Sequence, residues 1–415
     1  MPLRRATRGS ADTEPAPGKA TERICLVRQR DYYELSLRRE AEALRDAGFD
    51  VHIVCLREPG GPAVEVDDGV TLHRLPLTRR KGGPLNYLLD YLLFFVAATV
   101  TVAGLHLRLR FRAVQGNSMP DALAFAGFVP RLLGAKAVVF MKEPTPELGL
   151  TKYGSPRLAK LLQWVEQAAL RYVDLAFTVT EELKETYVAR GADPDKIVVV
   201  LNGPEAHHLL RHRTEIVPDP AWFTAICHGL VDERYGHDTM VRAVRLAKER
   251  IPRIRLRITG SGDYVPELEK LIESEGLQEH VQFLGWLDMP ELLAELAGAD
   301  VGIVAQKSSP YSNLVHTNKM YEYMLLDIPV VASRLRSTAR YFDDDAVQYF
   351  DAGSAESLAD ALVALYEAPQ RRRALVTRAR ELCRSYGWEA QREIYLAAYS
   401  HLLVRRPEDT TVASR

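Results

Sequence analysis

The segment TNKMYE at 317–322 combines residue types that suit an anionic ligand carrying hydroxyl groups. Thr317 or Asn318 can cap the helix that follows, and the first turn of a helix offers free N–H groups and the positive end of its dipole to an anion. Lys319 adds a full positive charge, which opposes the dipole unless an anion binds between them. Glu322 follows about one turn later, where its carboxylate could accept hydrogen bonds from the two hydroxyls of a ribose.

Two turns in the same half of the chain each follow a predicted strand. The run HGLVDERYGH at 228–237 holds Arg234, whose fixed charge and forked donors suit a phosphate. The run ITGSGD holds Gly260, Gly262 and Asp263, a pattern found in nucleotide-side turns of many α/β folds. Ligands of α/β sheets bind beyond the carboxyl ends of the strands, which predicts one shared site. A surface arginine and a plain tight turn remain the alternatives.

The first half carries its own candidates. Lys142 and Glu143 directly follow an apolar strand and enter a Pro-rich loop. Glu143 is our hypothesis for the group that receives or orients a proton, and Lys142 for one that binds phosphate or acceptor. Arg28 and Arg30 follow the first strand, where they could reach phosphates or an anionic acceptor. Solvated loop charges are the alternative for each of these residues.

The sequence predicts neither a metal ion nor a cofactor. It has no Gly-x-Gly-x-x-Gly dinucleotide fingerprint and no Walker-type phosphate loop, which argues against a dehydrogenase or a P-loop kinase. Asp343-x-Asp345 resembles a Mg²⁺-binding pair, but we interpret it as a solvated turn. His207, His208 and His212 cluster in a predicted linker without the carboxylate or cysteine spacing of a metal site.

Composition places the chain among ordinary globular proteins. It has 415 residues, 47% apolar and 26% charged, with a net charge of −1. These values predict two or three domains and exclude a disordered chain, a fibre and a multi-span membrane protein. Bulk charge gives no indication of nucleic-acid binding. Four cysteines without Cys-x-x-Cys spacing predict buried reduced thiols and a cytosolic protein, and residues 1–21 lack the apolar core of a secretory signal.

Apolar runs alternate with amphipathic segments of helix length, which predicts an α/β protein with parallel sheets. The predicted strands of the first half are 24–27, 51–56, 71–77, 113–115, 137–141, 175–179 and 197–201. Those of the second half are 223–227, 254–259, 281–284, 301–304, 329–332 and 347–349. Predicted helices include 35–47, 238–249, 264–275 and 290–297, and Gly48 is expected to end the first of these. Periodicity is lost near 205–221, which predicts the boundary between two halves.

One segment is apolar enough to contact a membrane. Tyr91–Leu107 has 17 residues and no formal charge, with Asp90 before it and three arginines closely after it. As a helix it would be about 26 Å long, shorter than a hydrocarbon core of about 30 Å. We interpret it as a buried helix of a large α/β domain. A helix in the membrane interface is the alternative, and the basic run at 79–81 would suit anionic lipid.

The second half resembles the donor domain of the GT-B glycosyltransferases, of the large retaining group called family four. The motifs that carry this resemblance are ERYG at 233–236, GSGD at 260–263, VQFLGW at 281–286, NKMYEYM at 318–324, IPVVAS at 328–333 and SYGWE at 385–389. The first half is similar to the acceptor domain of that family in RREAEAL at 38–44, PDALA at 120–124 and Asn202-Gly203. The resemblance covers about residues 22–402.

The resemblance implies a GT-B fold, in which two Rossmann-like α/β domains face each other across a cleft. It implies transfer of a sugar from a nucleoside diphosphate sugar, with retention and without a metal. It assigns Glu322 to the ribose and assigns Arg234 and Lys319 to the diphosphate, whose negative charge grows as it leaves. The implied parts are a disordered leader 1–21, an acceptor domain 22–205, a linker 206–221, a donor domain 222–385, a helix 386–405 returning to the first domain, and a tail 406–415.

The sequence departs from the family pattern in the donor half. The family often has a second Glu eight positions before Glu322, and this chain has Leu314 there. In the family, an Arg and a Lys follow the first strand of the donor domain. The corresponding positions here are Leu230 and Tyr235, and we take Arg234, one position before Tyr235, as the substitute. The segment 308–316 must therefore contact the sugar differently, and the sugar is not specified.

The leading hypothesis is a glycosyltransferase acting on a lipid-linked or polysaccharide acceptor, in the cytoplasm at the inner face of the membrane. One alternative is a sugar-nucleotide 2-epimerase on the same fold, which would epimerise its substrate without an acceptor. A second is a degenerate, non-catalytic member that binds nucleotide sugar or a partner protein, which would bind without turnover.

Overall fold

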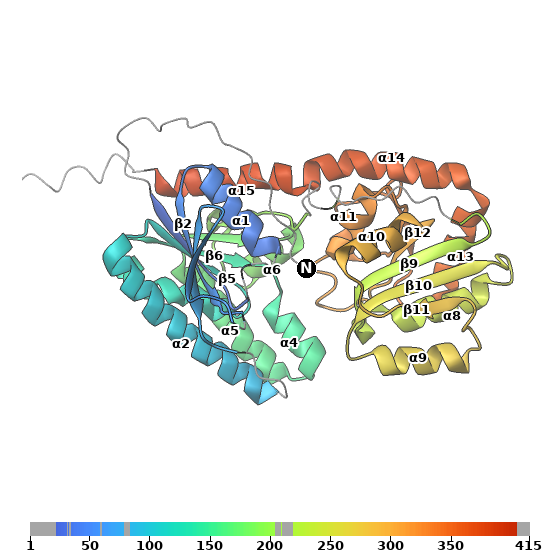
Figure 1. Ribbon diagram of the computed structural model, residues 1–415, viewed down its shortest axis with the longest axis horizontal. Coiled ribbons are helices and arrows are strands. Elements are labelled where there is room, and N and C mark those ends of the chain that lie inside the picture. The colour runs from blue at the N-terminus through green and yellow to red at the C-terminus, as the bar shows by residue number, and fades with distance from the viewer. Residues whose placement is uncertain are drawn as a thin grey trace, which may run out of the picture.

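The computed structural model describes residues 22–30, 32, 35–58, 60–78, 84–203, 209 and 219–404, which form two α/β domains (Figure 1). The predicted leader, the tail from 406, the basic run 79–81, the histidines at 207, 208 and 212, and most of the predicted linker lie outside the described residues.

The first domain is built on an eight-stranded sheet in the order β3-β4-β2-β1-β5-β6-β7-β8, parallel except for β3. Its strands are β1 Arg23–Val27, β2 Asp50–Leu56, β3 Val64–Asp67, β4 Val70–Leu75, β5 Ala113–Asn117, β6 Lys136–Met141, β7 Leu175–Thr178 and β8 Ile197–Val199. Its helices are α1 Leu35–Asp46, α2 Pro84–Leu109, α3 Phe128–Leu132, α4 Thr145–Tyr153, α5 Pro156–Tyr172 and α6 Glu181–Ala189, with short 3-10 turns η1 Asp121–Gly127 and η2 Pro194–Lys196.

The second domain has a six-stranded parallel sheet in the order β11-β10-β9-β12-β13-β14. Its strands are β9 Phe223–Leu230, β10 Ile254–Ser261, β11 Val281–Phe283, β12 Val301–Val304, β13 Val330–Ser333 and β14 Val347–Phe350. Its helices are α8 His237–Ala247, α9 Val265–Ser274, α10 Met289–Ala297, α11 Asn318–Leu325, α12 Arg336–Ala339, α13 Ala355–Glu367 and α14 Pro369–Tyr386, with the 3-10 turn η3 Glu233–Tyr235. The predicted α/β class and all the predicted strands are confirmed, within a few residues at their ends.

Each sheet changes winding direction at one place, and the site forms there. In the first sheet the chain goes outward from β1 to β2 and later from β5 to β6, so the switch lies between β1 and β5. In the second sheet it lies between β9 and β12. Loops that leave the carboxyl ends of such neighbouring strands diverge and open a crevice. The fold thus brings the loops after β1, β5, β9 and β12 toward one region, and the loop after β6 lies beside that of β5.

The last two helices tie the domains together. In Figure 1, α14 and α15 Trp388–Leu403 follow one another along one side of the molecule and span both domains. Trp388, Tyr395 and Tyr399 of α15 belong to the core of the first domain. The hydroxyls of Tyr395 and Tyr399 donate to Gln115 Oε1 on β5 at 3.0 and 2.7 Å. This last helix is therefore part of the first domain's packing.

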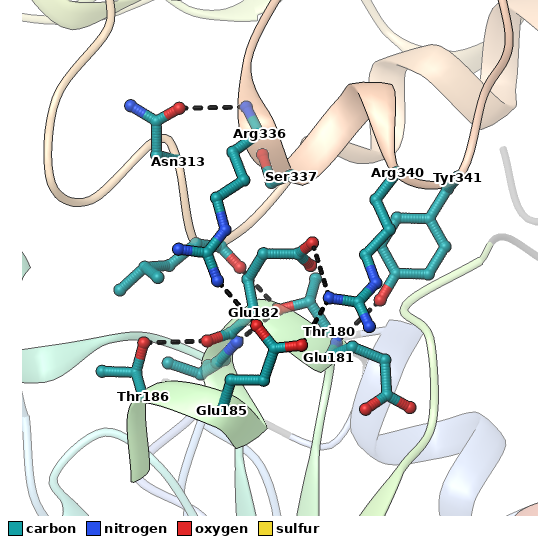
Figure 2. Close-up of polar contacts among 12 residues, drawn as sticks. Thr180, Glu181, Glu182, Glu185, Thr186, Asn313, Arg336, Ser337, Arg340 and Tyr341 are labelled. Carbon is teal, nitrogen blue, oxygen red and sulfur yellow. Dashed lines mark hydrogen bonds and ion pairs between the residues drawn. The ribbon is translucent and has the colours of Figure 1, made fainter. Parts of the chain in front are cut away.

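A polar interface joins α6 of the first domain to α12 of the second (Figure 2). Arg336 and Arg340 each donate to the Glu185 carboxylate at 2.7 Å. The backbone N–H of Glu181 donates to the Tyr341 hydroxyl at 2.7 Å. These contacts hold the domains in the arrangement that frames the site.

Helix α2 differs from its predicted environment. Residues Phe94, Ala98 and Val102 are fully buried against the sheet, as the 3.6-residue period requires of one face. Only 17% of the most apolar window within Leu88–Leu109 is buried, however, and among the described residues this is the one helix long and apolar enough to cross a membrane. The prediction of a buried helix was wrong, because apolar composition alone does not show which face of a helix packs.

All four cysteines are buried and free, which confirms the prediction of buried thiols. Cys25 and Cys55 lie on strands of the first sheet, Cys227 lies on β9 and Cys383 lies on α14. Burial raises the pKa of the Cys383 thiol to about 12, so this thiol stays protonated at neutral pH.

Candidate active site

A cavity of about 590 Å³ lies between the two domains, where the two switch points face each other. The first domain lines it with Arg28, Arg30, Ser36, Tyr91, Ser118, Met119, Lys142, Glu143, Leu148, Val179 and Asn202. The second domain lines it with Leu230, Arg234, Tyr235, Gln306, Tyr311, Val315, His316, Thr317 and Asn318. Its size is ordinary for a pocket that holds a small molecule.

The amino end of α11 opens onto this cavity. Thr317 is its N-cap, and its hydroxyl accepts from the backbone N–H of Lys319 at 3.5 Å. Asn318 Oδ1 accepts from Asn202 Nδ2 of the first domain at 3.0 Å. The predicted capped helix therefore presents its positive end toward the space between the domains, as an anion site requires.

Lys319 and Arg234 gather around Tyr235. Lys319 Nζ lies 4.5 Å from the centre of the Tyr235 ring, and the Arg234 guanidinium lies 5.3 Å from it. The Lys319 side chain passes so close to Gly229 that a Cβ there would lie 2.9 Å from Cε. Gly229 also has a φ of +99°. Glycine is therefore favoured here for two reasons: the backbone conformation, and the space that the Lys319 side chain occupies. Two cations separated in sequence thus approach one aromatic ring.

Glu322 lies beside His228 at the end of β9, with 3.2 Å between Glu322 Oε2 and His228 Nε2. Burial raises the pKa of Glu322 to about 7, and Lys319 opposes this shift. Burial and the Lys319 charge lower the pKa of His228 to about 3, so the imidazole is neutral. The Glu322 side chain remains 26% exposed, so its carboxylate stays within reach of a ligand hydroxyl.

The two glycines of the predicted nucleotide-side turn serve backbone packing. A Cβ on Gly260 would lie 1.7 Å from the Gly229 carbonyl oxygen, and one on Gly262 would lie 2.0 Å from that of Val231. The end of β10 and the residue after it, Gly262, therefore pack directly on the end of β9 and on Val231. Asp263 is exposed and lies outside the cavity lining.

Lys142 lines the cavity, yet its ammonium pairs with Glu40 inside the first domain. Gln115 and Asn117 donate to Glu40 Oε2 at 2.8 and 2.7 Å. Burial lowers the pKa of Lys142 to about 8, Glu40 opposes that shift, and the charges of Arg28 and Arg39 add to it. The ammonium therefore neutralises Glu40 at neutral pH and fixes the end of β6.

Glu143 is the one carboxylate among the residues that line the cavity. The Tyr311 hydroxyl, from the loop after β12, donates to Glu143 Oε2 at 2.6 Å. The Arg234 guanidinium lies 5.2 Å from the centre of the Tyr311 ring. Tyr311 therefore connects the acidic group of the first domain with the basic group of the second.

Arg28 and Arg30 line the first-domain wall of the cavity, Arg28 buried and Arg30 exposed. With Lys142 and Arg234 they make the lining predominantly basic against one carboxylate. Burial lowers the pKa of His316, also in the lining, to about 4, so it adds no charge at neutral pH. A basic cavity suits ligands with phosphate groups.

Two family models match the chain. "Glycosyl transferase 4-like domain" matches residues 33–203 and "Glycosyl transferases group 1" matches residues 223–368, so each covers one domain and together they span most of the sequence. The chain belongs to the glycosyltransferases built from these two domains. The predicted GT-B, family-four type is therefore confirmed, and in this group retention of configuration is typical.

Similarity to curated relatives extends over both domains. The chain is 25% identical over 388 residues to a D-inositol 3-phosphate glycosyltransferase of Pseudarthrobacter chlorophenolicus, covering 89% of this chain and 90% of that protein. It is 32% identical over 167 residues to a phosphatidyl-myo-inositol mannosyltransferase of Mycobacterium leprae, covering 40% and 43%. Among solved structures, sucrose-phosphate synthase of Thermosynechococcus elongatus superimposes with a TM-score of 0.72 at 19% identity, covering 92% and 99%. The last likeness confirms the GT-B fold.

In this glycosyltransferase the structure brings together most of the residues that the sequence singled out. Arg234 and Asn318 line the cavity, and Lys319 lies against the ring of Tyr235, which also lines it. Glu322, on the same helix as Lys319, lies beside His228 and outside the lining. Glu143 faces them from the first domain. Asp263 does not join this group, and the two glycines of its turn have a packing role.

Three contacts of the glycosyltransferase were not predicted from the sequence. His228 belongs to a sequence motif, but its approach to Glu322 joins strand β9 to helix α11 across 94 positions of sequence. Tyr311 had no sequence signal, since its loop departs from the family pattern. Asn202 showed only family likeness, and its contact with Asn318 links the two domains.

The aspartates at 343–345 pair with basic side chains. Asp343 accepts from Arg378 at 2.8 Å, and Asp345 lies 3.4 Å from Arg371. Within the described part of the chain no group of three or more His, Cys, Asp or Glu residues is arranged to hold a metal ion. The histidine cluster of the predicted linker lies outside that part.

Proposed function

We propose that this glycosyltransferase moves a hexosyl group from a nucleoside diphosphate sugar to a lipid-linked or polysaccharide acceptor, with retention and without a metal ion. The observation that carries the proposal is the cavity between the domains, where the basic cluster around Tyr235 faces Glu143. We further propose that it works in the cytoplasm, at the inner face of the cell membrane.

The second domain supplies the groups for the donor. Arg234, Lys319 and the amino end of α11 form a preorganised positive field where a diphosphate would gain charge as it leaves. Glu322 lies on α11 beside His228, where its carboxylate can accept hydrogen bonds from the ribose hydroxyls. Fixed positive groups of this kind can take the role that a divalent cation has in other transferases.

The first domain supplies the groups for the acceptor. Glu143 is positioned to receive or orient the proton of the acceptor hydroxyl. Arg28 and Arg30 give the acceptor wall a positive charge, which favours an acceptor with a phosphate group. Relatives named for an inositol phosphate and for phosphatidyl-myo-inositol agree with such an acceptor.

The test is thermal unfolding in the presence of a panel of nucleoside diphosphate sugars. A ligand at a hundredfold excess over its Kd stabilises the folded state by about 2.7 kcal/mol. We expect one sugar nucleotide to raise the Tm and the double variant Lys319→Ala/Glu322→Ala to lose the shift. Lys270→Ala/Glu273→Ala is the matched control, because it removes an exposed Lys and Glu at the same spacing on α9.

Three outcomes would change the assignment. A Tm that no sugar nucleotide raises contradicts the donor site. A shift accompanied by an epimerised sugar without any acceptor would favour the 2-epimerase, and a shift without turnover under any acceptor would favour the non-catalytic alternative.

A further inference from the structure

The outer face of α2 is an extended apolar surface without a partner in the described chain. Its large side chains are exposed along the helix, and these are Leu88, Leu89, Leu92, Leu93, Val96, Val100 and Leu107. A Cβ added at Gly104 of the same helix would meet no neighbouring atom within 4 Å. We call these residues the α2 face. Figure 1 shows α2 along the outer edge of the first domain.

The opposite side of α2 excludes a membrane-spanning role for this helix in the folded protein. Phe94, Ala98 and Val102 are fully buried in the core beneath the sheet. Gln29 Nε2, at the end of β1, donates to the Asp90 carbonyl at 2.9 Å. Crossing a bilayer would expose this core and break that contact. A helix fixed to a domain along one side and apolar along the other can only lie flat in an interface.

The surroundings of the α2 face indicate the chemistry of what it contacts. No formal charge occurs from Tyr91 to Leu107, and two arginines, Arg108 and Arg110, follow at its end. Exposed apolar residues of α3, among them Phe128 and Leu132, continue the surface, since α3 packs beside α2. An apolar surface with arginines at one end is complementary to a lipid surface with anionic headgroups.

The α2 face is also connected to the site. Tyr91, in the second turn of α2, lines the cavity between the domains, as does Arg30. Leu92 and Leu93, the next residues, are exposed. One helix therefore contributes to the cavity wall and to the apolar surface within a single turn, so an acceptor held in a bilayer would approach the cavity along α2.

We propose that the α2 face docks the protein on an anionic lipid bilayer, with α2 lying in the membrane interface. The proposal rests on the proposed function only in the statement that the docked cavity faces a lipid-linked acceptor. The docking itself needs neither donor nor acceptor, so it is measured without either, and its failure leaves the donor-site test unaffected.

The experiment is vesicle flotation of the full-length protein, with vesicles of phosphatidylcholine alone and of phosphatidylcholine mixed with phosphatidylglycerol. We expect the protein to float with the mixed vesicles, and high salt to weaken this binding. The variant Val96→Glu/Val100→Glu should bind at least about tenfold more weakly than the wild-type protein, because it places two charges in the apolar contact. The matched control is Val64→Glu/Val66→Glu on β3, which replaces two valines of similar exposure and makes the same change in charge.

Three outcomes would overturn the proposal. The wild-type protein does not float with either vesicle, or the α2 variant floats as well as the β3 control. In the third, the wild-type protein forms a dimer that only the α2 variant dissociates, while vesicle binding is the same for both variants. That result would show that a second copy of the chain covers the α2 face. Circular dichroism of both variants verifies that each remains folded.

Discussion

The hydroxyl of Tyr311 in the second domain donates a hydrogen bond of 2.6 Å to Oε2 of Glu143 in the first. Burial and the Glu143 charge raise the pKa of the Tyr311 phenol well above its ordinary value, so the phenol keeps its proton and remains a donor. Leu314 and Val315, in the same loop, pack into the core of the first domain. The orientation of the proposed catalytic carboxylate therefore depends on the second domain being in place.

Replacing Glu143 by Gln tests its proposed role in proton transfer. The amide keeps the shape of the side chain and cannot receive the proton, so we expect turnover to fall by about 10²- to 10⁴-fold. Donor binding should be preserved, because the donor groups lie in the second domain. Steady-state kinetics and calorimetric titration with the sugar nucleotide measure the two quantities, and near-normal turnover would rule out the assignment.

Tyr311→Phe tests whether the phenol positions and stabilises the ionised carboxylate. Loss of a hydrogen bond to a charged acceptor should lower kcat about tenfold and move the acidic limb of the pH–rate profile to higher pH, with little change in the KM for the donor. Tyr349→Phe is the matched control, since Tyr349 is also buried and donates to the Phe342 carbonyl at 2.9 Å. If both variants show the same profile, Tyr311 has only a packing role.

Glu322 predicts a pH dependence of donor binding. Burial raises its pKa from 4.5 to about 7, so the ionised fraction rises about tenfold between about pH 6 and about pH 8. If the carboxylate accepts the ribose hydroxyls, donor affinity should increase with pH over this range by a similar factor. The diphosphate of a sugar nucleotide does not titrate there. Titrations with Glu322→Gln should lose this dependence, and a wild-type affinity that stays constant with pH would contradict the assignment.

The raised pKa of Glu322 also makes the stability of the ligand-free protein depend on pH, and this stability contribution falls with rising pH whereas donor affinity should rise. The folded state holds the proton of Glu322 more tightly than the unfolded chain does, so this contribution to stability is fully present below pH 4.5 and is lost as the pH rises through about 7. Comparison of the wild-type protein and Glu322→Gln in urea across this range isolates the contribution.

The strands and the α11 site were predictable because their signals are local. Apolar runs bounded by polar turns indicated the strands, and Thr317 to Glu322 carry cap, charge and carboxylate within two turns. Strand β3 was not predicted, because its valines are exposed at the edge of the sheet and show no apolar run. The exposed side of α2 was not predicted either, because an apolar helix has the same sequence character whichever face is covered.

Contacts between distant residues were beyond local reasoning. The pairing of Lys142 with Glu40 joins residues 102 positions apart, and that of Tyr311 with Glu143 joins residues 168 apart. Both depend on which strands become neighbours and how the domains meet. The sequence therefore predicted most of the side chains that gather near the cavity, while their partners required the fold.

Gly260→Ala tests whether the end of β10 is fixed by backbone packing against β9. The substituted Cβ would collide with the Gly229 carbonyl oxygen at 1.7 Å, at a φ of +135° that side chains rarely adopt. We expect a loss of about 2–4 kcal/mol in the free energy of unfolding, measured by urea denaturation. Gly276→Ala is the control, because its φ is +62° but no atom lies within 4 Å of the added Cβ, so only about 1 kcal/mol should be lost. Equal losses in both variants would show that backbone conformation, and not the contact between the ends of the two strands, requires glycine at 260.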